Sequence, residues 1–143
     1  MTPEQIDLVR RSWMQVFPLR ETAAAMFYDK LFELDPALRP LFKPDLSQQA
    51  DKLFETLNAV VDSVGDPAAM AAIALPLGLS HARHGATPGH YDAVCAALMW
   101  TLAGSLGTAF TAPVRDAWAQ AYRLLAQAML AAQAAAGSTA TTA

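Results

Sequence analysis

Three histidines lie within ten residues of one another: His81, His84 and His90. Imidazole is the commonest metal ligand among protein side chains, so a zinc site is one interpretation. The spacing lacks the compactness typical of zinc sites, because His81 and His84 share a face of an expected helix over 76–84 while His90 follows a turn. A second interpretation is that each histidine lies on the surface or is a hydrogen-bonded core residue.

Two other polar side chains are predicted to point inward. Gln49 falls on the apolar face of an expected helix over 46–64, and Tyr28 falls on the inward line of one over 19–34. A buried amide costs about 1–3 kcal/mol without a partner, and a buried phenol also needs one. The ordinary explanation is a hydrated helix start for Gln49 and a backbone carbonyl partner for Tyr28. Phe42 ends a short apolar helix and would ordinarily belong to the core. Each of Tyr28, Gln49 and Phe42 has an ordinary explanation, but their occurrence together calls for a common one.

The elements that must position these side chains are all predicted to be helices, because alanine is abundant and β-branched residues are sparse. Helix starts share one signal, an oxygen-bearing side chain followed by proline, as in Thr2-Pro3 and Thr87-Pro88. We expect an irregular orthogonal packing of seven or eight helices, with residues 1–134 as one domain and 135–143 as a disordered tail. The expected helices span 3–16, 19–34, 36–42, 46–64, 67–74, 76–84, 88–106 and 112–134, with a break before Pro76.

Composition restricts the class of protein. The 143 residues are 54% hydrophobic and 16% charged, which suits one globular domain and excludes a disordered tail protein. A net charge of −3 gives no electrostatic reason to expect nucleic acid or an anionic membrane as partner. The single cysteine, Cys95, excludes a disulfide scaffold. The start is polar, and the apolar windows around 93–106 and 124–136 are shorter than a membrane span, so we expect a soluble cytoplasmic protein.

Five short motifs, in this order and spacing, resemble those of globins, in particular bacterial single-domain haemoglobins and the globin part of flavohaemoglobins. The resemblance covers residues 3 to about 133 and implies an all-α globin fold around a haem pocket. Its most specific part is residues 81–91, where a histidine precedes a glycine by four residues and a tyrosine by ten. The motifs are Phe27-Tyr28-Asp29, Pro36 with Leu41-Phe42, Gln49 with Lys52-Leu53, Ser80-His81-Ala82 with Gly85, Pro88 and Tyr91, and Asp116-Ala117-Trp118 with Tyr122.

The resemblance implies a role for each of these residues. His81 would be the axial iron ligand, with its other ring nitrogen held by a backbone carbonyl near Leu77 or by the Ser80 hydroxyl. Tyr28 and Gln49 would be hydrogen-bond donors on the opposite, distal face. The remaining pocket residues would be Phe42 stacked on the haem, Leu53 above the iron, Leu57, Val94 and Leu98 along the wall, Tyr91 on the proximal side, and Lys52 at the haem edge, near a propionate or in solvent.

The function implied is reversible dioxygen binding to haem b, for transport or storage, with an open or water-bound sixth position and with carbon monoxide and nitric oxide as further ligands. A hydrogen bond to a charged acceptor contributes about 1.5–3 kcal/mol, so Tyr28 would slow dioxygen loss by about ten- to a hundredfold. In the related family a glutamate late in the last helix contacts the proximal histidine together with the tyrosine. Here the matching stretch is Ala134-Ala135-Ala136, which argues against peroxidase-like chemistry.

Three competing hypotheses stay open. The protein could be a nitric oxide dioxygenase with Tyr28 and Gln49 as catalytic residues, serving nitric oxide detoxification. That activity would need a separate reductase, because the sequence carries no Gly-x-Gly-x-x-Gly fingerprint. The second hypothesis is a haem-based gas sensor, and the third is a helical bundle without haem, in which His81 is a satisfied core residue.

Overall fold

The described residues of the computed structural model, 1–83, 85 and 87–142, form six α-helices, three short 3-10 helices and no strand. This confirms the predicted all-α class, with two fewer α-helices than the upper expectation. His84, one of the candidate histidines, lies outside the described residues. The helices are α1 (Pro3–Val16), α2 (Arg20–Leu34), α3 (Ser47–Ser63), α4 (Pro67–Arg83), α5 (Pro88–Leu106) and α6 (Ala112–Thr142), and the 3-10 segments are Phe17–Leu19, Pro36–Leu41 and Gly107–Ala109.

Helices α1 and α5 begin with complete capping boxes. The Thr2 hydroxyl accepts from the Gln5 backbone N–H at 3.1 Å, and the Gln5 side chain accepts from the Thr2 N–H at 3.0 Å. In α5, Thr87 and His90 make the same reciprocal pair, with the Thr87 N–H donating to His90 Nδ1 at 3.2 Å. His90 therefore has a structural partner at a helix start, which is the role that the ordinary interpretation of this histidine requires.

The predicted break at Pro76 is wrong, because α4 runs through it without interruption from Pro67 to Arg83. A proline inside a helix removes one backbone hydrogen bond and costs about 3 kcal/mol or more, so other contacts must offset this loss. They come from the packing of α4 on α6, which is the most extensive contact between any two helices of the described part of the chain.

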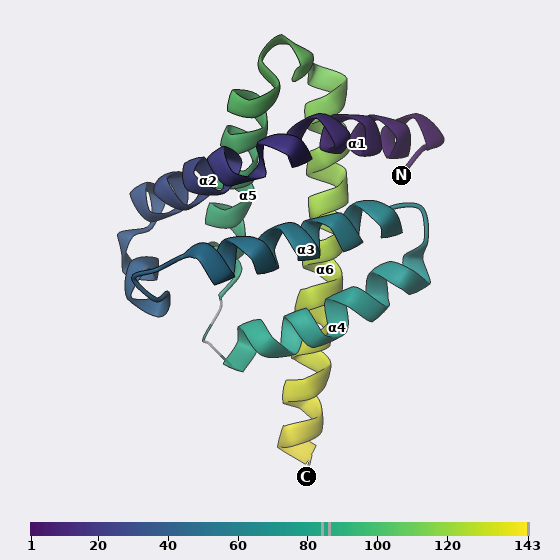
Figure 1. Cartoon of the computed structure of the whole chain (residues 1–143). Helices are drawn as coiled ribbons and strands as arrows, with labels where there is room; N and C mark the ends of the chain where they lie inside the picture. Colours follow the sequence, from purple (N-terminus) through teal and green to yellow (C-terminus); the bar gives the residue numbers. More distant parts are fainter. Residues whose placement is uncertain (84, 86, 143) are drawn as a thin grey trace.

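The helices cross steeply (Figure 1). α1 and α2 pass over α5 and α6, and α2 packs mainly on α5 while α1 packs on α6. Trp118 of α6 lies in this core, where its indole Nε1–H donates to Ser12 of α1 at 2.7 Å. α3 and α4 are joined by the turn 64–66, and their ends away from this turn carry Gln49 and His81.

The sequence predicted that the apolar window around 93–106 is shorter than a membrane span, and helix α5 is longer than that window. Within the part of the chain that the structure describes, the stretch Gly89–Ala109 is long and apolar enough, by length and composition alone, to cross a membrane. The same helix contacts α1, α2 and α6, as a core helix of a bundle does.

Helix α6 continues to Thr142, eight residues beyond the end expected at 134. The division into a domain over 1–134 and a disordered tail over 135–143 stays a prediction.

A glycine allows α4 to lie directly on the backbone of α6. A methyl group at Gly78 would lie 2.5 Å from the carbonyl oxygen of Met129 and 3.1 Å from its Cα, and neither atom can move independently of the helix. Because His81 follows Gly78 by less than one turn, this contact determines the height at which the imidazole sits along α6.

Substituting Gly78→Ala should therefore force the two helices apart and lower the free energy of unfolding by about 1–3 kcal/mol, as overpacking does. The matched control is Gly89→Ala in α5, where an added methyl would meet only the Thr87 hydroxyl, at 3.8 Å. Urea unfolding of both variants measures the difference. Equal stability of the two would show that the α4–α6 contact tolerates a side chain at position 78.

Candidate functional site

His81 lies in the last turns of α4 with a defined ring orientation. Its Nδ1 is 2.7 Å from the backbone carbonyl oxygen of Leu77, one turn earlier, which confirms one of the two acceptors predicted from the sequence. A carbonyl can only accept, so Nδ1 carries the proton and Nε2 carries the lone pair. The side chain is exposed, so this lone pair is accessible to a metal.

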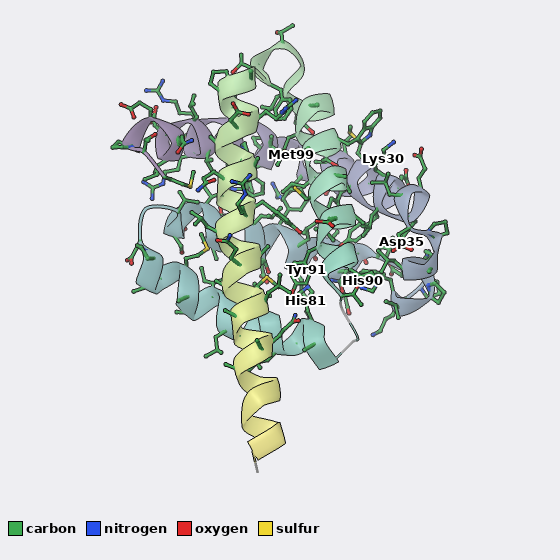
Figure 2. The ribbon with its side chains drawn as sticks, turned by 180° about the vertical axis from the view of Figure 1, so that it is seen from behind. Lys30, Asp35, His81, His90, Tyr91 and Met99 are labelled. Atoms are coloured by element: carbon green, nitrogen blue, oxygen red, sulfur yellow. The ribbon has the colours of Figure 1, made fainter. Side chains whose placement is uncertain are left out.

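Tyr91 of α5 lies beside His81, with ring centroids 6.3 Å apart (Figure 2). Helix α6 holds Tyr91 at both ends, because Gln133 Nε2 donates to its hydroxyl at 2.7 Å and the Tyr122 hydroxyl donates to its backbone carbonyl at 2.5 Å. Burial raises the pKa of Tyr91, and the bond from Gln133 opposes this only in part. Tyr91 is therefore a neutral phenol at physiological pH, fixed next to the imidazole.

Gln133 was not among the predicted site residues. The resemblance matched Ala134-Ala135-Ala136 to the glutamate of the related family, and the structure shows an uncharged neighbour of that stretch, Gln133, in contact with the Tyr91 hydroxyl. A signal was present in the sequence, because Gln133 extends the inward row of α6 at intervals of four residues. The preceding members of that row, all buried, are Ala117, Ala121, Leu125 and Met129.

Tyr28 and Gln49 meet on the other side of the site. The buried Tyr28 hydroxyl donates to the backbone carbonyl of Gln49 at 3.2 Å, and burial holds the pKa of Tyr28 well above its usual range. The Gln49 side chain is exposed in the first turn of α3. The carbonyl partner predicted for Tyr28 is thus confirmed, whereas the exposed Gln49 side chain also hydrogen-bonds to Tyr28, which opposes the raised pKa in part.

An aromatic cluster fixes the ring of Tyr28. Phe27 meets it edge-on at 5.1 Å between centroids, Phe32 stacks on it at 6.0 Å, and Phe42 meets it edge-on at 5.9 Å. Phe32 and Phe42 also contact each other edge-on at 5.4 Å. Side chains from α2 and from the turn before α3 therefore hold the phenol in one place.

The other predicted pocket residues present an incompletely covered apolar surface. Leu98 is buried, Lys52 is exposed, and the others are only partly buried against the core: Phe42, Leu53, Leu57, Leu77 and Val94. Covering apolar surface contributes about 25 cal/mol per Å², so these side chains favour a bound apolar group. An accessible imidazole lone pair beside such a surface fits a flat hydrophobic cofactor with one axial nitrogen ligand.

A metal held by protein side chains alone has less support. Over residues 1–83, 85 and 87–142, no three His, Cys, Asp or Glu side chains come together in a metal-binding group. The zinc interpretation also needs His84, which is not among these residues.

Replacing Gln133→Leu should leave the buried Tyr91 hydroxyl without its donor and lower the free energy of unfolding by about 1 kcal/mol. Gln127→Leu is the matched control, since Gln127 is an exposed residue of the same helix. Chemical denaturation compares the two variants. A loss no greater at 133 than at 127 would mean that the Gln133–Tyr91 bond is not formed in solution.

Comparison with known proteins adds an independent finding. The model of the globin family matches residues 25–129, which is most of the chain. Neuroglobin of Chaenocephalus aceratus is 28% identical over 137 residues, covering 86% of each chain, and neuroglobin-1 of Oncorhynchus mykiss is 27% identical over 143, covering 90% of each. These relatives are fish neuroglobins, so the finer resemblance to bacterial single-domain haemoglobins stays a prediction.

Proposed function

Because this chain belongs to the globin family, we propose that it binds haem b through His81 and holds dioxygen reversibly on the opposite face, beside Tyr28 and Gln49. His81 would hold the haem, which when bound would supply an iron centre able to take a small gas ligand. The observation that carries the proposal is the 2.7 Å contact between His81 Nδ1 and the Leu77 carbonyl, which orients Nε2 as the ligating nitrogen.

The proximal side favours binding over oxidative chemistry. His81 is bonded to a neutral backbone carbonyl, and the neighbouring Tyr91 is bonded to a neutral amide, Gln133. Neither contact draws the proton away from the imidazole as a carboxylate would, so the ring keeps little anionic character. This supports reversible binding of dioxygen, with transport or storage as the role.

Tyr28 would offer one proton to a ligand on the distal side. The raised pKa of Tyr28 keeps its hydroxyl protonated, but that proton is already shared with the Gln49 carbonyl. A polar gas ligand must therefore compete with this bond. The bond from Tyr28 to the ligand would contribute about 1.5–3 kcal/mol, and breaking its bond to the Gln49 carbonyl would cost about 0.5–1.5 kcal/mol. The difference corresponds to roughly a tenfold effect on ligand dissociation, at the lower end of the range expected from the sequence.

The axial ligand is tested by His81→Ala, which should lose the haem absorption spectrum after hemin is added and regain it with free imidazole. His90→Gln is the control, because glutamine can preserve the capping box that His90 forms with Thr87. Absorption spectra of reduced and carbon monoxide-treated samples give the result. Retention of the spectrum by His81→Ala, or equal loss in both variants, would assign the iron to another residue.

The distal donor is tested by Tyr28→Phe, which should raise the dioxygen dissociation rate about tenfold and change that of carbon monoxide much less. Tyr122→Phe is the matched control, because the Tyr122 hydroxyl also donates to a backbone carbonyl, that of Tyr91. Stopped-flow displacement measures both rates. An unchanged dioxygen rate in Tyr28→Phe would remove Tyr28 from the distal role.

Nitric oxide dioxygenation is the second candidate activity, because it would use the same Tyr28 and Gln49 with electrons from a separate reductase. Repeated turnovers of nitric oxide to nitrate with such a reductase would favour it.

We propose a cytoplasmic location, since the lone thiol of Cys95 suits a reducing compartment.

A further inference from the structure

The turn that carries Phe42 into the site is held by one side chain. Residues 42–44 lie between the 3-10 segment Pro36–Leu41 and α3, outside any helix or strand that could satisfy their carbonyl groups. The guanidinium of Arg39 donates to all three in succession. Its Nη1 lies 3.3 Å from the Phe42 oxygen and 3.1 Å from the Lys43 oxygen, and its Nη2 lies 3.2 Å from the Pro44 oxygen.

The same guanidinium reaches the aromatic cluster. Its Cζ lies 5.2 Å from the ring centroid of Phe32, within the range of a cation–π contact. Phe32 in turn stacks on Tyr28 and meets Phe42 edge-on. Arg39 thus contacts the backbone that carries Phe42 and one of the rings that hold the Tyr28 phenol.

We propose that Arg39 is a positioning residue for the gas pocket: its guanidinium fixes the turn 42–44 and, through Phe32, the orientation of Tyr28. The planar guanidinium suits this role because its five donors form a rigid fork, whereas a lysine ammonium is a compact group that would not span three carbonyls. This inference rests on the proposed function, since it assigns Arg39 to the pocket that Tyr28 and Phe42 would form.

Arg20 provides a matched comparison within the chain. Its guanidinium also lies over a phenylalanine ring, 4.7 Å from the centroid of Phe17, and donates to one backbone carbonyl, that of Phe17, at 3.2 Å. Arg20 begins α2 at the junction with α1, and its ring partner, Phe17, is not a member of the aromatic cluster around Tyr28. Replacing Arg20 therefore removes the same kind of contact from another place.

The experiment compares Arg39→Met, Arg39→Lys and Arg20→Met in the full-length protein, before and after hemin is added. Before hemin, hydrogen exchange of the Phe42 amide, which donates to the Arg39 carbonyl at 3.1 Å, should be about tenfold faster in Arg39→Met. After hemin, the carbon monoxide stretching band should broaden or split, and dioxygen dissociation should accelerate several-fold. Arg39→Lys should fall between Arg39→Met and the unchanged protein, and Arg20→Met should match the unchanged protein.

Each outcome bears on a different statement. If all variants take up hemin but Arg39→Met matches Arg20→Met in exchange, band shape and dissociation rate, the inference about Arg39 is wrong while the proposed function stands. If Arg39→Lys behaves as the unchanged protein in all three, charge alone suffices and the role of the rigid fork is wrong. If the unchanged protein itself takes up no hemin, the proposed function fails, and the exchange rates still decide whether Arg39 fixes the turn.

Discussion

The close approach of α4 to α6 at Gly78 is the contact on which the site depends. Because no side chain separates the two backbones there, α4 packs directly on the backbone of α6. His81 therefore lies close to Tyr91, which side chains of α6 hold in place. Displacing α4 by the thickness of one methyl group would move the imidazole relative to Tyr91. The same contact explains how the helix passes through Pro76 despite losing a backbone hydrogen bond.

The polar rings of the site are oriented by the same kind of partner. Tyr28, His81 and Tyr122 each bond to a backbone carbonyl, on Gln49, Leu77 and Tyr91 respectively. A carbonyl held in a helix moves only with the helix, so these bonds orient the rings more rigidly than flexible side-chain partners would. The carbonyl partners are themselves uncharged, which suits a pocket for a neutral gas better than for a charged substrate.

The two sides of the site differ in what holds them. On the proximal side, long helices position His81 and Tyr91, and the contacts that support Tyr91 come from Tyr122 and Gln133 of α6. On the distal side, Phe42 belongs to an irregular turn whose carbonyls accept hydrogen bonds from the Arg39 guanidinium. The distal wall therefore relies on a few side-chain contacts, where the proximal wall relies on helix packing.

The all-helical class, most helix starts and the inward direction of Tyr28 could be predicted from the sequence, because capping residues and a 3.6-residue period act locally. The resemblance implied a carbonyl near Leu77 or the Ser80 hydroxyl as the acceptor for His81, and the structure shows the Leu77 carbonyl, one turn earlier in the same helix, at this place. Three features follow from the tertiary structure: α4 continues through Pro76, Gln133 contacts the Tyr91 hydroxyl, and Arg39 holds the turn at Phe42. The period of α6 turned Gln133 inward, but the partner that it meets, like the other two outcomes, depends on contacts between segments far apart in the chain or on an irregular turn.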